Sequence, residues 1–599
     1  MYISRVVLAT AFVFGGASAA SAQIDFSGMW APIFHEDHVE RIPGPDLGDY
    51  AGLPITEAGR MRALAWDASL LTLPEHQCKP HPSTYGFRGV GNLRIWPEFD
   101  DATERLVKLN THIQWQEQRR EIWLDGRTHP PEYAPHTWQG FSTGRWEGDV
   151  LVVRTTHLKA GWMRRNGLPL SDKTTMTERF IRHGDLLTHV YIIEDPVYLT
   201  EPLVKTNGFR ITANPNLQPY PCRPVVEVPR AAGEVPHHLP GQNPFAEEYA
   251  TRHKLAVAGT RGGAETALPE FVRTPAVPPT PAATARRPAG LSAPPVKADE
   301  VHAWHVQGNV WMLAGPGGNA AVSIGADGVL VVDTMSAAVS ETLLAAVRKL
   351  AGDKPIRYIV NTSAGPNHTG GNQTIAAAGE SIIGGNFAGD VGANAANVAT
   401  IIAHEAVLNR MTRSQPTAEP VPTDAWPDET FFTAKMEMHF NGEGVELLHQ
   451  PNAHSDGDLM VYFRGSDVVV AGEIFVTTTF PVLRTDQGGT LDGVIAALNR
   501  IIDITIPKDK QEGGTYVIPG AGRLTDEADV VEYRDMLTII RDRLKDAAAR
   551  GLTIQQVKAA GLLRDYEDRY GTDAAWSSDA FLDAAYGPMA KAAAAGVSR

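Results

Sequence analysis

The chain has 599 residues, enough for two or more domains, and its 43% hydrophobic and 21% charged residues are ordinary globular usage. This composition excludes a largely disordered chain, a collagen, a coiled coil and a polytopic membrane protein. The formal charge of −15 at pH 7 argues against nucleic acid as a partner, because binding to a polyanion is driven by basic side chains.

The first 22 residues have the pattern of a secretory signal peptide. Arg5 precedes an apolar run at residues 6–14, and residues 20–22 are the small amino acids that a signal peptidase reads. We therefore expect cleavage before Gln23 and a mature protein that is periplasmic or secreted. No later segment is apolar over the length that a bilayer requires, so no transmembrane segment is expected.

Cys78 and Cys222 are the two cysteines of the chain. In an exported protein such a pair predicts one disulfide, which would close a long loop and stabilise the fold by about 4 to 5 kcal/mol. The alternative is a soft-metal site formed by His76, Cys78 and His81, although their spacing matches no closed zinc pattern.

A proline-rich stretch between Pro269 and Pro295 divides the chain, because such a composition favours an extended spacer and cannot build a core. We therefore expect a signal peptide at residues 1–22, a first domain at 23–260, a linker at 261–297 and a second domain at 298–599.

The first domain is predicted to be mostly β. Short strand-like runs at residues 121–124, 149–153, 175–182 and 187–194 alternate with turn signals, which is typical of an antiparallel meander or barrel. The segments REIWLDGRTHP, HTWQGFSTGRWEGD and TERF resemble a secreted bacterial lipocalin-like domain of unknown function. Ser142 lies in a G-x-S-x-G pattern, but no helix is expected after it, so we place it in a hairpin and not in a nucleophile elbow.

The second domain begins with predicted strands at residues 310–313, 320–324 and 329–333, a helix at 336–350 and a strand at 356–360. The last strand runs into the loop NTSAGPNHTGGN. The later segments PNAHSDGDLMVYF, VVVAGEIF and YVIPGAG follow in an order that resembles the metallo-β-lactamase fold. The resemblance covers residues 300–570 and implies a four-layer αββα sandwich. Residues 393–412 show helical spacing and are expected to form a flanking helix.

The order and positions of the loops resemble this family, but several of the family's metal-ligand residues are replaced. In the intact family the first loop reads H-x-H-x-D-H, and its four ligands act with a later histidine, a bridging aspartate and a final histidine to hold two zinc ions. The corresponding positions here are Ser363, Gly365, Asn367, His368, His454, Glu473 and Ala521. Four of these seven positions, namely Ser363, Gly365, Asn367 and Ala521, have therefore lost a good ligand.

The remaining ligands, His368, His454 and Glu473, could hold at most one zinc or other divalent ion. The losses argue against a binuclear centre. Asp333 and Asn367 are expected to support the loop from outside the ligand set. Ser363 with His368 as its base is a further alternative, without an identifiable oxyanion hole.

The resemblance implies an exported hydrolase-family protein with a degraded metal site, at most a mononuclear metal-assisted hydrolase of an ester, lactone, thioester or lactam. The alternative is an inactive pseudoenzyme that acts as a periplasmic binding module for a small molecule, or as a scaffold.

Overall fold

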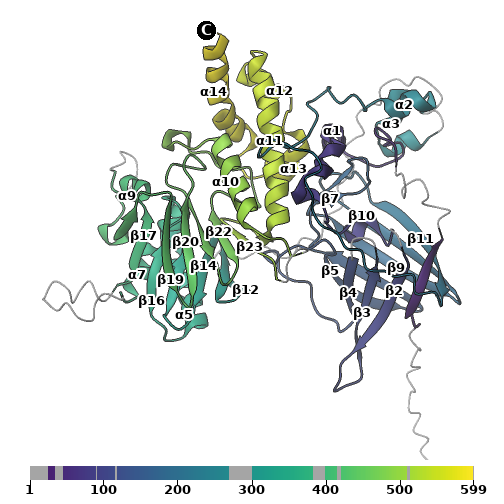
Figure 1. Cartoon of the computed structure of the whole chain (residues 1–599), viewed down its shortest axis with the longest axis horizontal. Coiled ribbons are helices and arrows are strands. Elements are labelled where there is room, and N and C mark those ends of the chain that lie inside the picture. Colours follow the sequence, from purple (N-terminus) through teal and green to yellow (C-terminus); the bar gives the residue numbers. More distant parts are fainter. Residues whose placement is uncertain are drawn as a thin grey trace, which may run out of the picture.

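A computed structural model describes residues 24–33, 45–88, 91–114, 118–268, 271, 300–381, 398–413, 420–508 and 513–597. The expected signal peptide and residues 272–299 of the expected linker and its flank lie outside these ranges. The described residues form a closed β-barrel, followed in sequence by two further sheets with their helices (Figure 1). No helix among them is long and apolar enough to cross a bilayer.

Nine strands in the order β1-β11-β10-β9-β6-β5-β4-β3-β2 close the barrel, which confirms the predicted β-rich first domain. Neighbouring strands are antiparallel, except for the parallel pair β4 and β5. The strands are β1 (Gly28–Ile33), β2 (Leu93–Phe99), β3 (Leu106–Ile113), β4 (Gln118–Trp123), β5 (Phe141–Glu147), β6 (Val150–Thr156), β9 (Thr175–His183), β10 (Leu186–Glu194) and β11 (Leu203–Thr212).

Buried side chains form the core of the barrel. Phe26, Trp30 and Phe180 belong to its apolar part, so these aromatic residues are core residues. A polar cluster is buried between strand β4 and the neighbouring strands β9 and β10, where Arg120 donates hydrogen bonds to the carboxylate of Glu178 and His189 Nε2 lies 2.8 Å from Glu178 Oε1. Burial alone would raise the pKa of Glu178, but Arg120 and His189 hold it at about 2.

Ser142 is part of the same cluster. It lies inside strand β5 and not in the hairpin loop expected from the sequence, and its hydroxyl accepts a 2.9 Å hydrogen bond from Arg120 Nε. The side chain is 1% exposed. The G-x-S-x-G pattern therefore forms the start of a barrel strand, and its serine is buried in the core.

Short helices and turns cover the barrel. They include α1 (Glu57–Ala65), α2 (Glu248–His253), α3 (Val257–Thr260), the two-stranded pair β7 (Gly161–Trp162) and β8 (Pro169–Leu170), and the 3₁₀ helices η2 (Ala68–Thr72), η3 (Pro74–His76), η4 (Ser83–Tyr85) and η6 (Ala264–Ala267). The amide of Gly52 donates a 2.8 Å hydrogen bond to Thr266 Oγ1 in η6. The first residues of the expected linker thus pack on the first domain.

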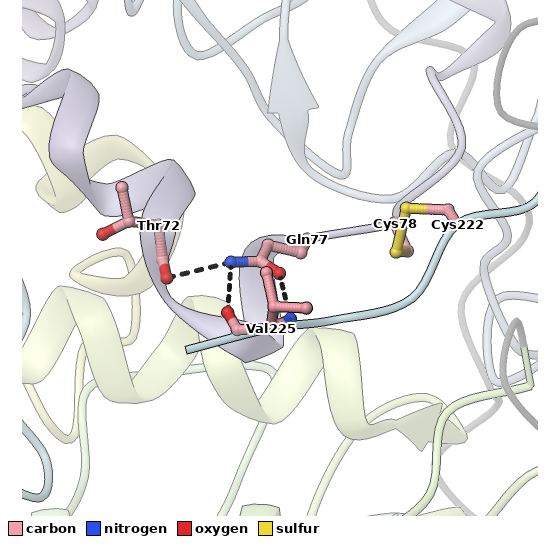
Figure 2. The surroundings of a disulfide bond; sticks show 5 residues. All are labelled: Thr72, Gln77, Cys78, Cys222 and Val225. Atoms are coloured by element: carbon pink, nitrogen blue, oxygen red, sulfur yellow. Dashed lines mark hydrogen bonds between the residues drawn. A yellow bond between two sulfur atoms is a disulfide. The ribbon is translucent and has the colours of Figure 1, made fainter. Parts of the chain in front are cut away.

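The disulfide between Cys78 and Cys222 is present, as the sequence predicted, with the two Cα atoms 5.5 Å apart. Figure 2 shows how the neighbouring Gln77 fastens the same two segments: its amide donates to the carbonyls of Thr72 and Val225, and its oxygen accepts from the Val225 amide. The alternative metal site is therefore wrong, because the cysteine sulfur is bonded to its partner.

The second domain contains two sheets. The first has the order β12-β13-β14-β15-β16-β17-β18, and the second has the order β19-β20-β21-β22-β23-β24. The strands of the first sheet are β12 (His302–Gln307), β13 (Val310–Gly315), β14 (Gly318–Ile324), β15 (Val329–Val332), β16 (Ile356–Val360), β17 (Thr400–His404) and β18 (Glu429–Phe431). Those of the second are β19 (Lys435–Phe440), β20 (Glu443–His449), β21 (Leu459–Phe463), β22 (Val468–Gly472), β23 (Tyr516–Pro519) and β24 (Thr525–Asp526).

Alternate residues of each strand face different layers of the second domain. Val332 of β15 packs with Leu447 and Val461 between the two sheets, whereas its neighbour Val331 packs with Leu343 of α5 on the outer face. Helices α5 (Ser340–Ala351) and α7 (Asn372–Ala377) cover the first sheet, and α10 (Leu491–Ile504) and α11 (Glu527–Ala549) cover the second. The layer order is therefore helix, sheet, sheet, helix, which agrees with the predicted sandwich.

The remaining helices are α6 (Pro366–Thr369), α9 (Glu405–Met411), α12 (Ile554–Ala559), α13 (Arg564–Tyr570) and α14 (Ser578–Val597). Residues 393–397 of the expected helix over 393–412 lie outside the described ranges. The prediction is wrong at residues 400–404, which form strand β17, and α9 begins only at Glu405. The β-branched residues of this segment pair with β16 and β18 inside the sheet, and this burial overrides the helical spacing.

Candidate functional site

The predicted site residues lie at the ends of strands. β15 and β16 run parallel, so Asp333 and the loop that begins at Asn361 leave the first sheet at the same edge. Glu473 follows β22 of the second sheet, and His454 lies between β20 and β21. A backbone hydrogen bond of 3.0 Å from Leu459 to Thr362 joins the two sheets at this edge.

Asp333 organises the first of these loops. Its Oδ1 accepts a 2.8 Å hydrogen bond from the Thr362 amide, and its Oδ2 accepts a 2.6 Å bond from the Thr362 hydroxyl. The same oxygen lies 2.7 Å from His368 Nδ1. Asp333 has a φ of 61°, a left-handed conformation that is uncommon outside glycine. The backbone is thus held in an unfavourable conformation that brings this carboxylate onto the loop.

His368 lies between two carboxylates. While Nδ1 contacts Asp333, Nε2 lies 3.0 Å from Oε1 of Glu473, and the imidazole is 2% exposed. Burial alone would lower the pKa of His368, but the two carboxylates raise it well above the ordinary value of 6.5. In the protonated form, which the two carboxylates favour, His368 donates a hydrogen bond from each ring nitrogen.

Glu473 is the more exposed of the two carboxylates that contact His368. Burial raises the pKa of its carboxyl group, but the hydrogen bond from His368 and the charges of His454 and Arg484 lower it to about 2. The side chain is 17% exposed, in contrast to the 2% of Asp333. Glu473 is thus the part of the Asp333-His368-Glu473 chain that solvent or a ligand can reach.

His454 is held separately. Its Nδ1 lies 3.3 Å from Oδ1 of Asp458, which also accepts from the hydroxyl of Ser455. The carbonyl of His454 accepts a 2.9 Å hydrogen bond from the amide of Arg484. The charge of His454 thus lowers the pKa of Glu473, but the hydrogen bond of its ring goes to Asp458 in its own loop.

The four positions without a good ligand have other contacts. Ser363 is buried, and its hydroxyl accepts from the Gly365 amide at 3.4 Å. Gly365 is the N-cap of α6, Asn367 is exposed beside the turn at Gly317, and the carbonyl of Ala521 accepts from the Thr477 amide. Since both ring nitrogens of His368 contact carboxylates, the alternative pairing of Ser363 with this histidine as its base is not formed.

These residues do not fit a zinc centre. Within the described ranges, no group of three or more His, Cys, Asp and Glu side chains could hold a metal ion. A catalytic zinc usually needs three protein ligands, whereas His368 offers no free ring nitrogen and the four degenerate positions supply a hydroxyl, an amide or no donor at all. The chemistry that this arrangement supports is hydrogen bonding and charge pairing.

Sequence reasoning missed the residues that hold the backbone of His368. Its carbonyl accepts hydrogen bonds from Asn361 Nδ2 at 2.9 Å and from the Thr334 hydroxyl at 3.1 Å, and both side chains also contact Asn372 Oδ1. All three are buried. The signal was available in the sequence: asparagines at both ends of the glycine-rich loop are well suited to bond backbone groups.

Comparison with family models and with curated proteins finds no match. Among solved structures the chain is similar to a metallo-beta-lactamase from Pontibacter korlensis, at 14% identity over 40% of this chain and 99% of that one, with a TM-score of 0.30. It is also similar to the inverting sec-alkylsulfatase Pisa1 from Pseudomonas sp., at 14% identity over 48% and 50% of the two chains, with a TM-score of 0.36. DIM-1 metallo-beta-lactamase matches at 16% identity over 40% and 97%, with a TM-score of 0.30.

Proposed function

We propose that this chain is an exported member of the metallo-β-lactamase superfamily that binds a small molecule and does not act as a metallohydrolase. The order of the sheets, the helices on both outer faces and the position of the loops at one sheet edge support the superfamily assignment. The signal-peptide pattern and the disulfide support export.

The observation that carries the proposal is the position of His368 between Asp333 and Glu473. An intact site would balance its carboxylates with metal ions, whereas here an imidazolium supplies the positive charge. Because a metal ligand must present a free lone pair, His368 can bind an ion only after it gives up its proton and its contact with Glu473. The internal hydrogen-bond chain thus competes directly with a metal.

Elemental analysis tests this proposal. The mature protein, purified without chelators from medium supplemented with zinc and iron, is expected to contain well below one metal ion per chain. A double variant, His368→Ala with His454→Ala, should give the same value. A content of about one ion per chain that is lost in the double variant would instead support a mononuclear hydrolase on His368, His454 and Glu473, and would justify a screen of esters, lactones, thioesters and lactams.

We place the ligand in a cavity of about 410 Å³ between α10, α11 and α14. This volume lies in the range of small-molecule sites, and the lining is mostly apolar, including Leu491, Ala548, Met589 and Ala592. At its mouth Lys545 contacts Asp492 at 3.2 Å, so the two charges compensate each other and an uncharged apolar ligand fits best.

The wall of this cavity continues into the candidate site. The amide of Thr490, a lining residue, donates to the carbonyls of Asn452 and Ala453, both at 3.0 Å, in the loop that carries His454. A ligand in the cavity would therefore contact the segment that positions His454.

The uncharged fluorescent probe N-phenyl-1-naphthylamine tests the cavity. The wild type is expected to bind it with enhanced fluorescence, and Ala592→Phe should abolish binding because the ring occupies the space of the ligand. Ala594→Phe is the matched control, since Ala594 is exposed on the same helix but does not line the cavity. Equal binding by the two variants would show that the probe binds elsewhere.

A further inference from the structure

The two loops of the second sheet that flank the candidate site are joined to each other. One follows β22 and carries Glu473, and the other follows β23 and carries Ala521. The amide of Gly520 donates a 2.9 Å hydrogen bond to the carbonyl of Gly472, and the amide of Thr477 donates a 3.1 Å bond to the carbonyl of Ala521. A displacement of either loop is therefore transmitted to the other.

Two arginines hold this pair of loops at Thr477. Arg569 of α13 donates from Nη2 to the Thr477 carbonyl at 2.7 Å. Arg523, which lies two residues beyond Ala521, donates from its backbone amide to the Thr477 hydroxyl at 3.2 Å. Both guanidinium groups are buried. The loops are thus held by two residues whose buried guanidinium groups need an anion, and the guanidinium of Arg569 itself contacts the loop.

The first domain supplies that anion. Asp172 lies between β8 and β9 of the barrel domain and accepts hydrogen bonds from Arg569 Nε at 2.5 Å and Nη2 at 2.8 Å. Its Oδ2 also lies 3.4 Å from Nη2 of Arg523. Burial alone would raise the pKa of Asp172, but Arg569 and Arg523 hold it well below its ordinary value. Figure 1 shows α13 beside α1 of the first domain.

The two arginines do not depend on Asp172 equally. Arg523 has a second carboxylate partner in Asp529 at 2.6 Å, which also contacts Lys159 of the first domain. For Arg569, the carboxylate contact found within the described residues is the one to Asp172. Loss of Asp172 would therefore affect Arg569 more strongly than Arg523. The contact of Arg569 with the Thr477 carbonyl would be weakened as a consequence.

We propose that Asp172 is a positioning residue through which the first domain sets the two loops that flank the candidate site. The barrel domain is then an integral part of this site and not an independent module on a linker. This inference goes beyond the proposed function, because it holds whatever the site binds.

Hydrogen–deuterium exchange of the full-length Asp172→Asn variant tests the inference. Asparagine keeps the size of the side chain but removes the charge, and its NH₂ group replaces one of the two oxygens that accept from Arg569. Amides of residues 473–480 and 520–524 are expected to exchange about tenfold faster or more, because buried bonds to a charged group are lost. The rest of the barrel and the first sheet should be unchanged.

Glu532→Gln is the matched control, since Glu532 on α11 contacts Arg62 of the first domain at 3.3 Å across the same interface but does not touch either loop. It should leave exchange in both loops unchanged, and Asp172→Glu should restore most of the protection because it retains the charge. Uniformly faster exchange over the whole chain, or equal effects of Asp172→Asn and Glu532→Gln, would overturn the inference.

Arg569→Lys provides a second variant should Asp172→Asn fail to fold. A single ammonium group keeps the positive charge but cannot hold the Asp172 carboxylate in a bidentate contact and the Thr477 carbonyl at once. The same two loops should lose protection by about tenfold. Unchanged exchange in this variant would contradict the role of Arg569 as the link between the first domain and the loops.

Discussion

Replacing His368 with alanine is expected to lower the free energy of unfolding of the second domain by about 3 to 5 kcal/mol. The substitution removes the cation between Asp333 and Glu473 and leaves two carboxylates close together, one of them almost fully buried. It also removes a ring that is 2% exposed. Urea denaturation at neutral pH, compared with the wild type, measures this loss.

His454→Ala is the natural comparison. Because its side-chain hydrogen bond is a long contact of 3.3 Å to Asp458, we expect a cost of only about 1 kcal/mol. A chelator should leave the stability of the wild type unchanged. If the two histidines instead shared a metal ion, both variants would lose similar amounts of stability and the chelator would destabilise the wild type. The two histidines thus distinguish an internal hydrogen-bond chain from a metal site.

A second large effect is expected in the barrel, where Glu178→Gln should lower the free energy of unfolding by about 3 to 5 kcal/mol. The variant keeps the shape of the side chain but leaves the guanidinium of Arg120 buried without its anion. It should also change the response to acid.

The sign of the acid response follows from the pKa of Glu178, which is about 2 in the fold and 4.5 ordinarily. Its charge therefore stabilises the fold above pH 4.5, and this contribution, about 3 kcal/mol, is lost as the pH falls toward 2. In Glu178→Gln this part of the acid destabilisation should be absent.

Glu121→Gln serves as the control for this experiment. Glu121 lies on β4 beside Arg120 and contacts Lys108 at 2.5 Å, but its side chain is 50% exposed. A pair of this kind contributes less than about 1 kcal/mol, so urea denaturation at pH 7 and pH 3 should show little change. Equal stability of Glu178→Gln and the wild type at pH 7 would contradict the buried ion pair as a stabilising contact.

Much of the architecture could be predicted from the sequence because it is encoded locally. Runs of β-branched residues that end in polar, glycine-rich loops marked β15, β16, β21, β22 and β23, and an even pair of cysteines in an exported chain marked the disulfide. The seven candidate ligand positions came from the resemblance to a known fold. Residues 400–404 show where local patterns fail. Their spacing predicts a helix, but the segment pairs with other strands inside a sheet.

The sequence by itself thus determined the strands, their loops and the identity of the side chains that the loops carry. Only the tertiary structure decided what those side chains contact. His368 and Glu473 are 105 residues apart, and Asp172 is 397 residues from Arg569. Such pairs depend on which strands and domains become neighbours in the fold. The energy of a buried charge depends on its distance to the opposite charge, and the pattern of residues along the chain does not give that distance. For this reason the sequence left a metal site open, while the fold places the ring of His368 between two carboxylates.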